Sequence, residues 1–108
     1  MCEKDYMTAL YEKVQTEYDD FIAEMKDKSA DEIIESAYQI VIKGEITVFC
    51  RDCSPKLTDG QFEALLSSKN ALYEIFEQWC KNGELHGLAD IGIAIEEAAD
   101  RILVSFGQ

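Results

Sequence analysis

The sequence predicts an all-α protein, a compact bundle of about five helices with no substantial sheet, folded as a single domain over residues 1–108. Three observations predict this fold. Apolar residues recur at intervals of three and four through most of the chain, which is the spacing of one helical face. Serine, threonine and asparagine residues precede these segments in positions typical of helix starts. One proline and six glycines among 108 residues leave few breaks, and an apolar content of 47% is enough to form a core.

The first predicted helix, from about Glu3 to Lys26, has the clearest helical period. Charged and polar residues fill most positions between its apolar residues, so the helix is amphipathic. Its apolar face consists of Met7, Leu10, Tyr11, Val14, Tyr18, Phe21, Ile22 and Met25.

A second helix is predicted to begin after Ser29, because Ser29 and Glu32 have the spacing of a capping box. Asp31 and Glu32 then fall in its first turn, where the helix dipole favours negative charge. The apolar face of this helix consists of Ile33, Ile34, Ala37, Tyr38, Val41 and Ile42.

The end of the second helix has two interpretations. Gly44 is a residue type that often ends a helix, and residues 45–49, "EITVF", have the composition of a strand. We favour a helix that continues past Gly44, because Ile46, Phe49 and Cys53 keep the helical spacing. A single strand would also have no second strand with which to pair.

Three further helices follow Pro55, which ends the preceding element. Thr58 and Gln61 form a second capping box before a short helix, and a third start lies near Asn70. The fourth helix ends at Asn82-Gly83, and the last runs from about residue 85 or 88 to residue 106. The apolar residues of these three helices are Phe62, Leu65, Leu66, Leu72, Ile75, Phe76, Trp79, Leu88, Ile91, Ile95, Ala98, Ile102, Leu103 and Phe106.

The last helix is unusual because its first half, "ADIGIAIEEA", is apolar on more than one side. Such a helix is either central in a bundle or covered by another molecule. We favour the central position.

The charge of the chain limits its function. There are 22 acidic and 10 basic residues, a net charge of −12. This balance opposes direct binding to nucleic acid or to anionic membranes and favours a basic protein partner. No apolar run approaches the roughly 20 residues of a membrane span, and the first residues are too charged for a signal peptide. We therefore expect a cytoplasmic protein with reduced thiols.

Motifs for catalysis are absent from the sequence, so we expect a protein without enzymatic activity or cofactor. The nearest to a metal site is the set Cys50, Cys53, Cys80 and His86. Five residues between Cys80 and His86 make a poor zinc-ligand spacing, and an all-α domain with five apolar faces does not need a metal to fold. We prefer Cys50 and Cys53 as small apolar residues on one helical face.

Carboxylates form the strongest candidate binding surface. Along the first helix four of them are separated by three or four residues, which is roughly 4.5 to 6 Å of helix axis. This spacing is comparable with that of phosphates along a nucleic-acid strand. Acidic residues on the second and last helices extend the set. The candidate partner-binding residues are Glu17, Asp19, Asp20, Glu24, Asp27, Asp31, Glu32, Glu35, Glu96, Glu97 and Asp100.

Residues 11–46 resemble a family of short acidic helical proteins of unknown function, common in gut Firmicutes and their mobile elements. The resemblance rests on "YEK" at residues 11–13, "DEIIESAY" at 31–38 and "VIKGEI" at 41–46, with weaker similarity in "LTDGQFEALL" and "LYEIFEQW". It implies no catalytic residues. A mobile-element setting implies an inhibitor of host defence, such as an anti-CRISPR or anti-restriction protein, since these are often small, acidic and helical.

Together these observations predict an interaction protein that places carboxylates in a basic nucleic-acid-binding surface of a defence nuclease. The first alternative is a regulatory or assembly module that forms a homodimer through the apolar surface of the last helix. The least favoured alternative is a small zinc-binding protein.

Overall fold

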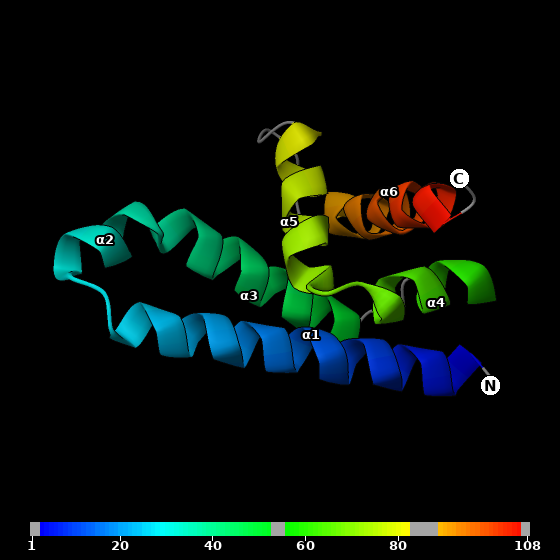
Figure 1. Ribbon diagram of the computed structural model, residues 1–108, viewed down its shortest axis with the longest axis horizontal. Coiled ribbons are helices and arrows are strands. Elements are labelled where there is room, and N and C mark those ends of the chain that lie inside the picture. The colour runs from blue at the N-terminus through cyan, green and yellow to red at the C-terminus, as the bar shows by residue number, and fades with distance from the viewer. Residues whose placement is uncertain (1–2, 53–55, 83–88, 107–108) are drawn as a thin grey trace.

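The computed structural model describes residues 3–52, 56–82 and 89–106, and in these ranges it contains six α-helices and no strand. The all-α prediction is confirmed, and residues 45–50 are helical. The predicted roles of Cys53, Pro55, Gly83 and His86 lie outside the described residues. The helices shown in Figure 1 are α1 (Glu3–Lys26), α2 (Ala30–Glu35), α3 (Ala37–Asp52), α4 (Asp59–Ser67), α5 (Ala71–Lys81) and α6 (Ala89–Phe106).

The predicted helix starts are confirmed in atomic detail. The Ser29 hydroxyl accepts a hydrogen bond from the Glu32 N–H, and the Glu32 carboxylate accepts one from the Ser29 N–H. Thr58 and Gln61 make the same reciprocal pair before α4. The Asn70 side chain accepts from the N–H of Tyr73 at the start of α5. Each cap satisfies amides that the helix itself leaves without acceptors.

The predicted second helix is divided into α2 and α3 at Ser36. This residue has φ −93° and ψ 0°, and its N–H donates to the carbonyl oxygens of Glu32 and Ile33 at 3.1 Å each. The Ser36 carbonyl in turn accepts from the N–H of Ile40 at 3.0 Å, so helical bonding resumes at once. The interruption is one residue long, and no glycine or proline in the sequence marks it. Gly44 lies inside α3, as the favoured interpretation predicts.

The core lies at one end of the molecule. Figure 1 shows α1 and α3 side by side and antiparallel, with α4, α5 and α6 gathered over the part of α1 nearer its N-terminus. Helix α6 packs against both α4 and α5. It buries one face and exposes Ile93, Leu103 and Val104 on the other, so it is not surrounded on all sides as a central helix would be. The largest fully buried side chains are Leu10, Val14, Ile46, Phe62, Leu65, Leu72, Ile75, Ile91 and Ile95.

The other end of the molecule is a helical hairpin, with α1 on one side and α2 and α3 on the other, that extends beyond α4, α5 and α6 (Figure 1). Residues 15–41, which we name the hairpin arm, contain no buried side chain. The arm comprises the second half of α1, all of α2 and the start of α3. Some of its side chains reach α5: Glu17 accepts hydrogen bonds from the first turn of α5, and the Tyr38 ring lies 5.8 Å from Trp79 and 6.3 Å from Phe76.

This arrangement corrects the interpretation of residues 33–42 as a face that packs into the bundle. Ile34, Tyr38 and Val41 are 71%, 41% and 56% exposed, while Ile42 is buried. Their spacing correctly predicted a helix. The prediction failed at the next step, because a helical period shows which residues share a face and not whether another element covers that face.

Candidate functional site

Five predicted binding residues form one exposed group on the hairpin arm. We name them the arm carboxylates: Asp20, Glu24, Asp27, Asp31 and Glu35. All five are exposed, and none of their side chains makes a hydrogen bond or ion pair with another residue that the structure describes. Asp20 and Glu24 lie on α1, Asp27 follows its end, and Asp31 and Glu35 lie on α2. The group therefore presents negative charge to solvent, with Lys43 near enough to Glu24 for the two charges to interact.

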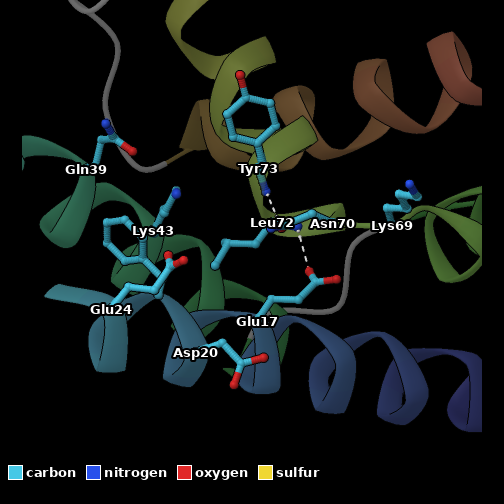
Figure 2. A pocket seen from close by; sticks show the side chains of 10 residues that line it. Glu17, Asp20, Glu24, Gln39, Lys43, Lys69, Asn70, Leu72 and Tyr73 are labelled. Carbon is cyan, nitrogen blue, oxygen red and sulfur yellow. Dashed lines mark hydrogen bonds between the residues drawn. The ribbon is translucent and has the colours of Figure 1, made fainter. Parts of the chain in front are cut away.

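Glu17, in contrast, faces the interior of the fold. Its side chain is only 11% exposed and forms an ion pair with Lys13 at 3.0 Å. Its two oxygens accept hydrogen bonds from the N–H groups of Leu72 at 2.8 Å and Ala71 at 3.2 Å, and Figure 2 draws the bond to Leu72. Glu17 thus supports the start of α5 and contributes no oxygen that is available to a partner.

The first turn of α5 is consequently fully satisfied. Glu17 accepts from the first two amides, the Asn70 side chain accepts from the third, and the Asn70 carbonyl accepts from the N–H of Glu74 at 3.2 Å. Helix starts normally leave four amides without intrahelical acceptors. The carboxylate also places negative charge at the positive end of the α5 dipole.

The other predicted carboxylates are divided between local bonds and a separate helix. Asp19 accepts from Gln15, and Glu32 belongs to the α2 capping box. Three predicted residues, Glu96, Glu97 and Asp100, lie on α6, which Figure 1 places apart from α2. Among these, Glu97 accepts from Asn82 and Asp100 from Gln61. The structure therefore does not join the α6 acids and the arm carboxylates into one surface.

An apolar stripe runs along α2 and α3, from the arm to Val48 beyond it. It consists of Ile34, Tyr38, Val41 and Val48, separated by four, three and seven residues, so the side chains share one face of α2 and α3. Each is more than a third exposed. Exposed apolar patches rimmed by polar residues are typical of protein-binding surfaces.

A cavity of about 460 Å³ opens at the base of the arm, where α1, α3 and the start of α5 meet (Figure 2). Lys43 reaches it from α3 and is only 5% exposed. Its ammonium Nζ lies 3.9 Å from the ring centre of Phe21, 5.6 Å from that of Phe76 and 5.8 Å from that of Tyr73. Burial lowers the pKa of Lys43, and the nearby negative charge of Glu24 opposes this shift.

The cysteine set does not form a metal site in the part of the chain that the structure describes. Cys50 is buried on α3, and burial raises the pKa of its thiol to about 12. Cys80 is half-buried on α5, whereas Cys53 and His86 lie outside the described residues. The described residues hold no group of three or more potential metal ligands. The burial of Cys50 agrees with a small apolar residue in the core.

Lys43 is the functional candidate that the sequence interpretation missed. The sequence placed Lys43 on one helical face with positions 46, 47 and 50, because these positions are separated by one, three or four residues. In the structure all four are buried. A lysine on such a face buries its methylene stem and must extend its ammonium to water or place it against favourable groups inside the fold. The partners that create this environment come from α1 and α5, and local sequence does not indicate them.

Residues 6–103 match the model of a family described as "Protein of unknown function (DUF3848)". The chain belongs to the DUF3848 family. The matched range contains the complete hairpin arm and every residue that lines the cavity, so both are part of the DUF3848 region of the chain. No curated protein and no solved structure matches the chain. Among the described helices, none is both long enough and apolar enough to cross a bilayer.

Proposed function

We propose that this protein is a non-enzymatic interaction protein of the cytoplasm that binds a basic surface of a protein partner through the hairpin arm. The arm carboxylates are the observation that carries this proposal. They are exposed, close in sequence and without hydrogen bonds in the described part of the chain. The arm that bears them has no buried side chain, so a partner can approach it from several sides.

The energetics of the arm favour a binding role over a stabilising one. Like charges three or four residues apart destabilise a helix by a few tenths of a kcal/mol per pair. Asp20 and Glu24 have this spacing on α1, Asp27 follows just beyond its end, and no described cation forms an ion pair with any of them. A basic partner would relieve this repulsion, and long-range attraction between opposite charges would accelerate the encounter.

The proposed partner is a nuclease of bacterial defence, and the proposed action is inhibition. Its nucleic-acid-binding groove must be basic, and carboxylates spaced roughly 4.5 to 6 Å along a helix imitate a row of phosphates. The resemblance to proteins of mobile elements supports this choice of partner, since such elements gain from an anti-CRISPR or anti-restriction protein. The apolar stripe adds contact area that nucleic acid lacks.

A homodimer is the second candidate, and the apolar stripe is the observation that favours it. Exposed apolar residues lie on α2 and α3 and also on α6, where Ile93, Leu103 and Val104 are exposed although Ile91, Ala94 and Ile95 are buried in the bundle. Charge opposes this candidate. Glu45 lies between Val41 and Val48 on the same face, so a symmetric dimer would bring carboxylates together. Light scattering at low and high salt distinguishes a dimer from a monomer.

The experiment for the proposed function is a plasmid-cleavage assay with a panel of purified CRISPR and restriction nucleases at increasing salt. We expect inhibition of at least one enzyme, with an inhibition constant that rises steeply with salt because the contact is ionic. Unaffected cleavage by every enzyme of the panel would overturn the choice of partner, and salt-independent inhibition would overturn the carboxylate mechanism.

A further inference from the structure

The cavity at the base of the hairpin arm has the properties of a small-molecule site. Its volume of about 460 Å³ falls within the usual range of ligand pockets, roughly 300–1,000 Å³. The walls come from three separate parts of the chain: α1, α3 and the segment that leads into α5. The hydrogen bonds from Glu17 to the start of α5 hold two of these walls together.

One wall carries a largely buried cation. Lys43 is 5% exposed and lines the cavity, and within the described residues its ammonium makes aromatic contacts but no hydrogen bond or ion pair. The charge of Glu24 acts on this ammonium, whose three N–H donors are open to an acceptor in the cavity. A ligand with an anionic oxygen would supply such an acceptor.

The rim of the cavity carries charges of both signs. Asp20 and Glu24 are exposed on α1, and Lys69 is exposed before α5. Glu17 also lines the cavity, but both of its oxygens already accept hydrogen bonds. The charged groups left for a ligand are therefore two carboxylates and two ammonium groups.

The presence of both carboxylates and ammonium groups in the lining favours one class of ligand. A phosphate or another multiply charged anion would be repelled by Asp20 and Glu24. A simple cation would be repelled by Lys43. A molecule with one positive and one negative group avoids both penalties, and Phe21 and Leu72 add apolar surface to the lining of the cavity.

We propose that the cavity binds a free amino acid, or a similar zwitterion, with an apolar side chain. The ammonium groups of Lys43 and Lys69 donate hydrogen bonds to the ligand carboxylate. Glu24 accepts hydrogen bonds from the ligand ammonium, the negative charge of Asp20 adds to the attraction, and the ligand side chain packs against Phe21. Such a ligand would bridge α1, α3 and α5 and stabilise the base of the hairpin arm. This proposal does not depend on the nuclease partner.

Calorimetric titration of the full chain with L-leucine, L-methionine and L-phenylalanine tests the proposal. We expect at least one of them to bind and to raise the thermal midpoint of unfolding. For phenylalanine, phenethylamine lacks the carboxylate and 3-phenylpropanoate lacks the ammonium. For whichever amino acid binds, the matching amine and acid should bind at least about tenfold more weakly, because each loses charge-assisted hydrogen bonds. No binding by any of the three amino acids, or equal binding of the analogues, would overturn the proposal.

Two variants test whether the ligand binds in this cavity. Lys43→Met keeps a linear side chain of similar length and removes the ammonium, and we expect it to weaken binding at least about tenfold. Glu24→Gln changes an exposed cavity residue on α1, and it should also weaken binding. It provides the test if Lys43→Met folds poorly. Lys56→Met, at an exposed lysine outside the cavity, is the matched control and should bind as the unmodified protein does. Undiminished binding by both cavity variants would overturn the assignment.

Discussion

The Glu17 carboxylate on α1 accepts a hydrogen bond from the backbone N–H of Leu72, 2.8 Å away in the first turn of α5. The two residues are 55 positions apart in the chain. The contact joins the base of the hairpin arm to the core, and it also forms the lower edge of the Lys43 cavity (Figure 2). A residue predicted to bind a partner therefore has a structural role, and its contribution is measurable.

Replacing Glu17 with alanine should lower the free energy of unfolding by about 1–2 kcal/mol, because two amides lose a charged acceptor at a helix start. Urea denaturation measures this value. Asp20→Ala, three residues further along α1, removes an exposed carboxylate and should change stability by less than about 0.5 kcal/mol. If the two variants have the same stability, Glu17 does not support α5.

Gly44 provides a test of the packing between α1 and α3. A Cβ atom at this position would lie 3.0 Å from the Tyr18 hydroxyl oxygen, which donates to the carbonyl of Ile40. Gly44→Ala should therefore destabilise the protein, although alanine is favoured over glycine in a helix by about 1 kcal/mol. In a Tyr18→Phe background the obstructing oxygen is gone, and Gly44→Ala should stabilise by up to about 1 kcal/mol.

The same sign for Gly44→Ala in both backgrounds would contradict this packing. The four proteins form a double-mutant cycle, and thermal or urea unfolding of each gives the coupling between the two positions.

Tyr6 should govern part of the alkaline unfolding of the protein. Its hydroxyl donates to the Glu63 carboxylate at 2.7 Å, and this bond, with burial and the charges of Glu63 and Asp59, raises the pKa of Tyr6 from 10.0 to about 12. The folded state thus keeps a proton that the unfolded state releases. The stabilisation is fully present below pH 10.0 and is lost as the pH rises through about 12.

Tyr6→Phe keeps the ring that stacks on Phe62 and removes the titrating hydroxyl. We expect the variant to lose less stability than the unmodified protein between pH 10.0 and about 12. Urea midpoints across this range measure the difference. Cys50, whose pKa is also raised, is present in both proteins and cancels in the comparison. Parallel pH profiles would exclude a role for the Tyr6–Glu63 bond.

The hairpin arm should open more readily than the core. Residues 15–41 have no buried side chain, whereas α5 buries Leu72, Ile75, Phe76 and Trp79. Local opening is easiest where few apolar contacts must be broken. Hydrogen exchange followed by mass spectrometry should show faster exchange in the arm peptides than in α5 peptides. Equal protection of the two regions would show that the arm is held as firmly as the core.

Local sequence signals predicted the helices well. The bounds of α1 follow from its apolar period, and Ser29, Thr58 and Asn70 were recognisable as caps because side-chain capping depends on residues within one turn. The break at Ser36 was missed, since neither glycine nor proline marks it. Ser36 is a single residue between two helical segments, and the apolar residues before and after it keep the same helical spacing.

The candidate site was only partly predictable because its parts come from distant segments. The charge period of α1 correctly indicated exposed residues at Asp20, Glu24 and Asp27. The same period included Glu17, and only the position of α5 shows that this carboxylate is already engaged. The environment of Lys43 likewise depends on rings from α1 and α5. Such contacts are set by tertiary packing, which one sequence does not specify.

The most direct test of the binding role of the hairpin arm is a pair of charge-matched variants in the nuclease assay. Asp27→Lys/Glu35→Lys reverses two arm carboxylates near helix C-termini, where lysine suits the dipole and the fold should persist. Glu12→Lys/Glu96→Lys changes the net charge equally at exposed positions outside the arm. We predict that inhibition by the first variant is lost and that inhibition by the second is retained. Equal inhibition by the two variants would contradict the role of the arm carboxylates.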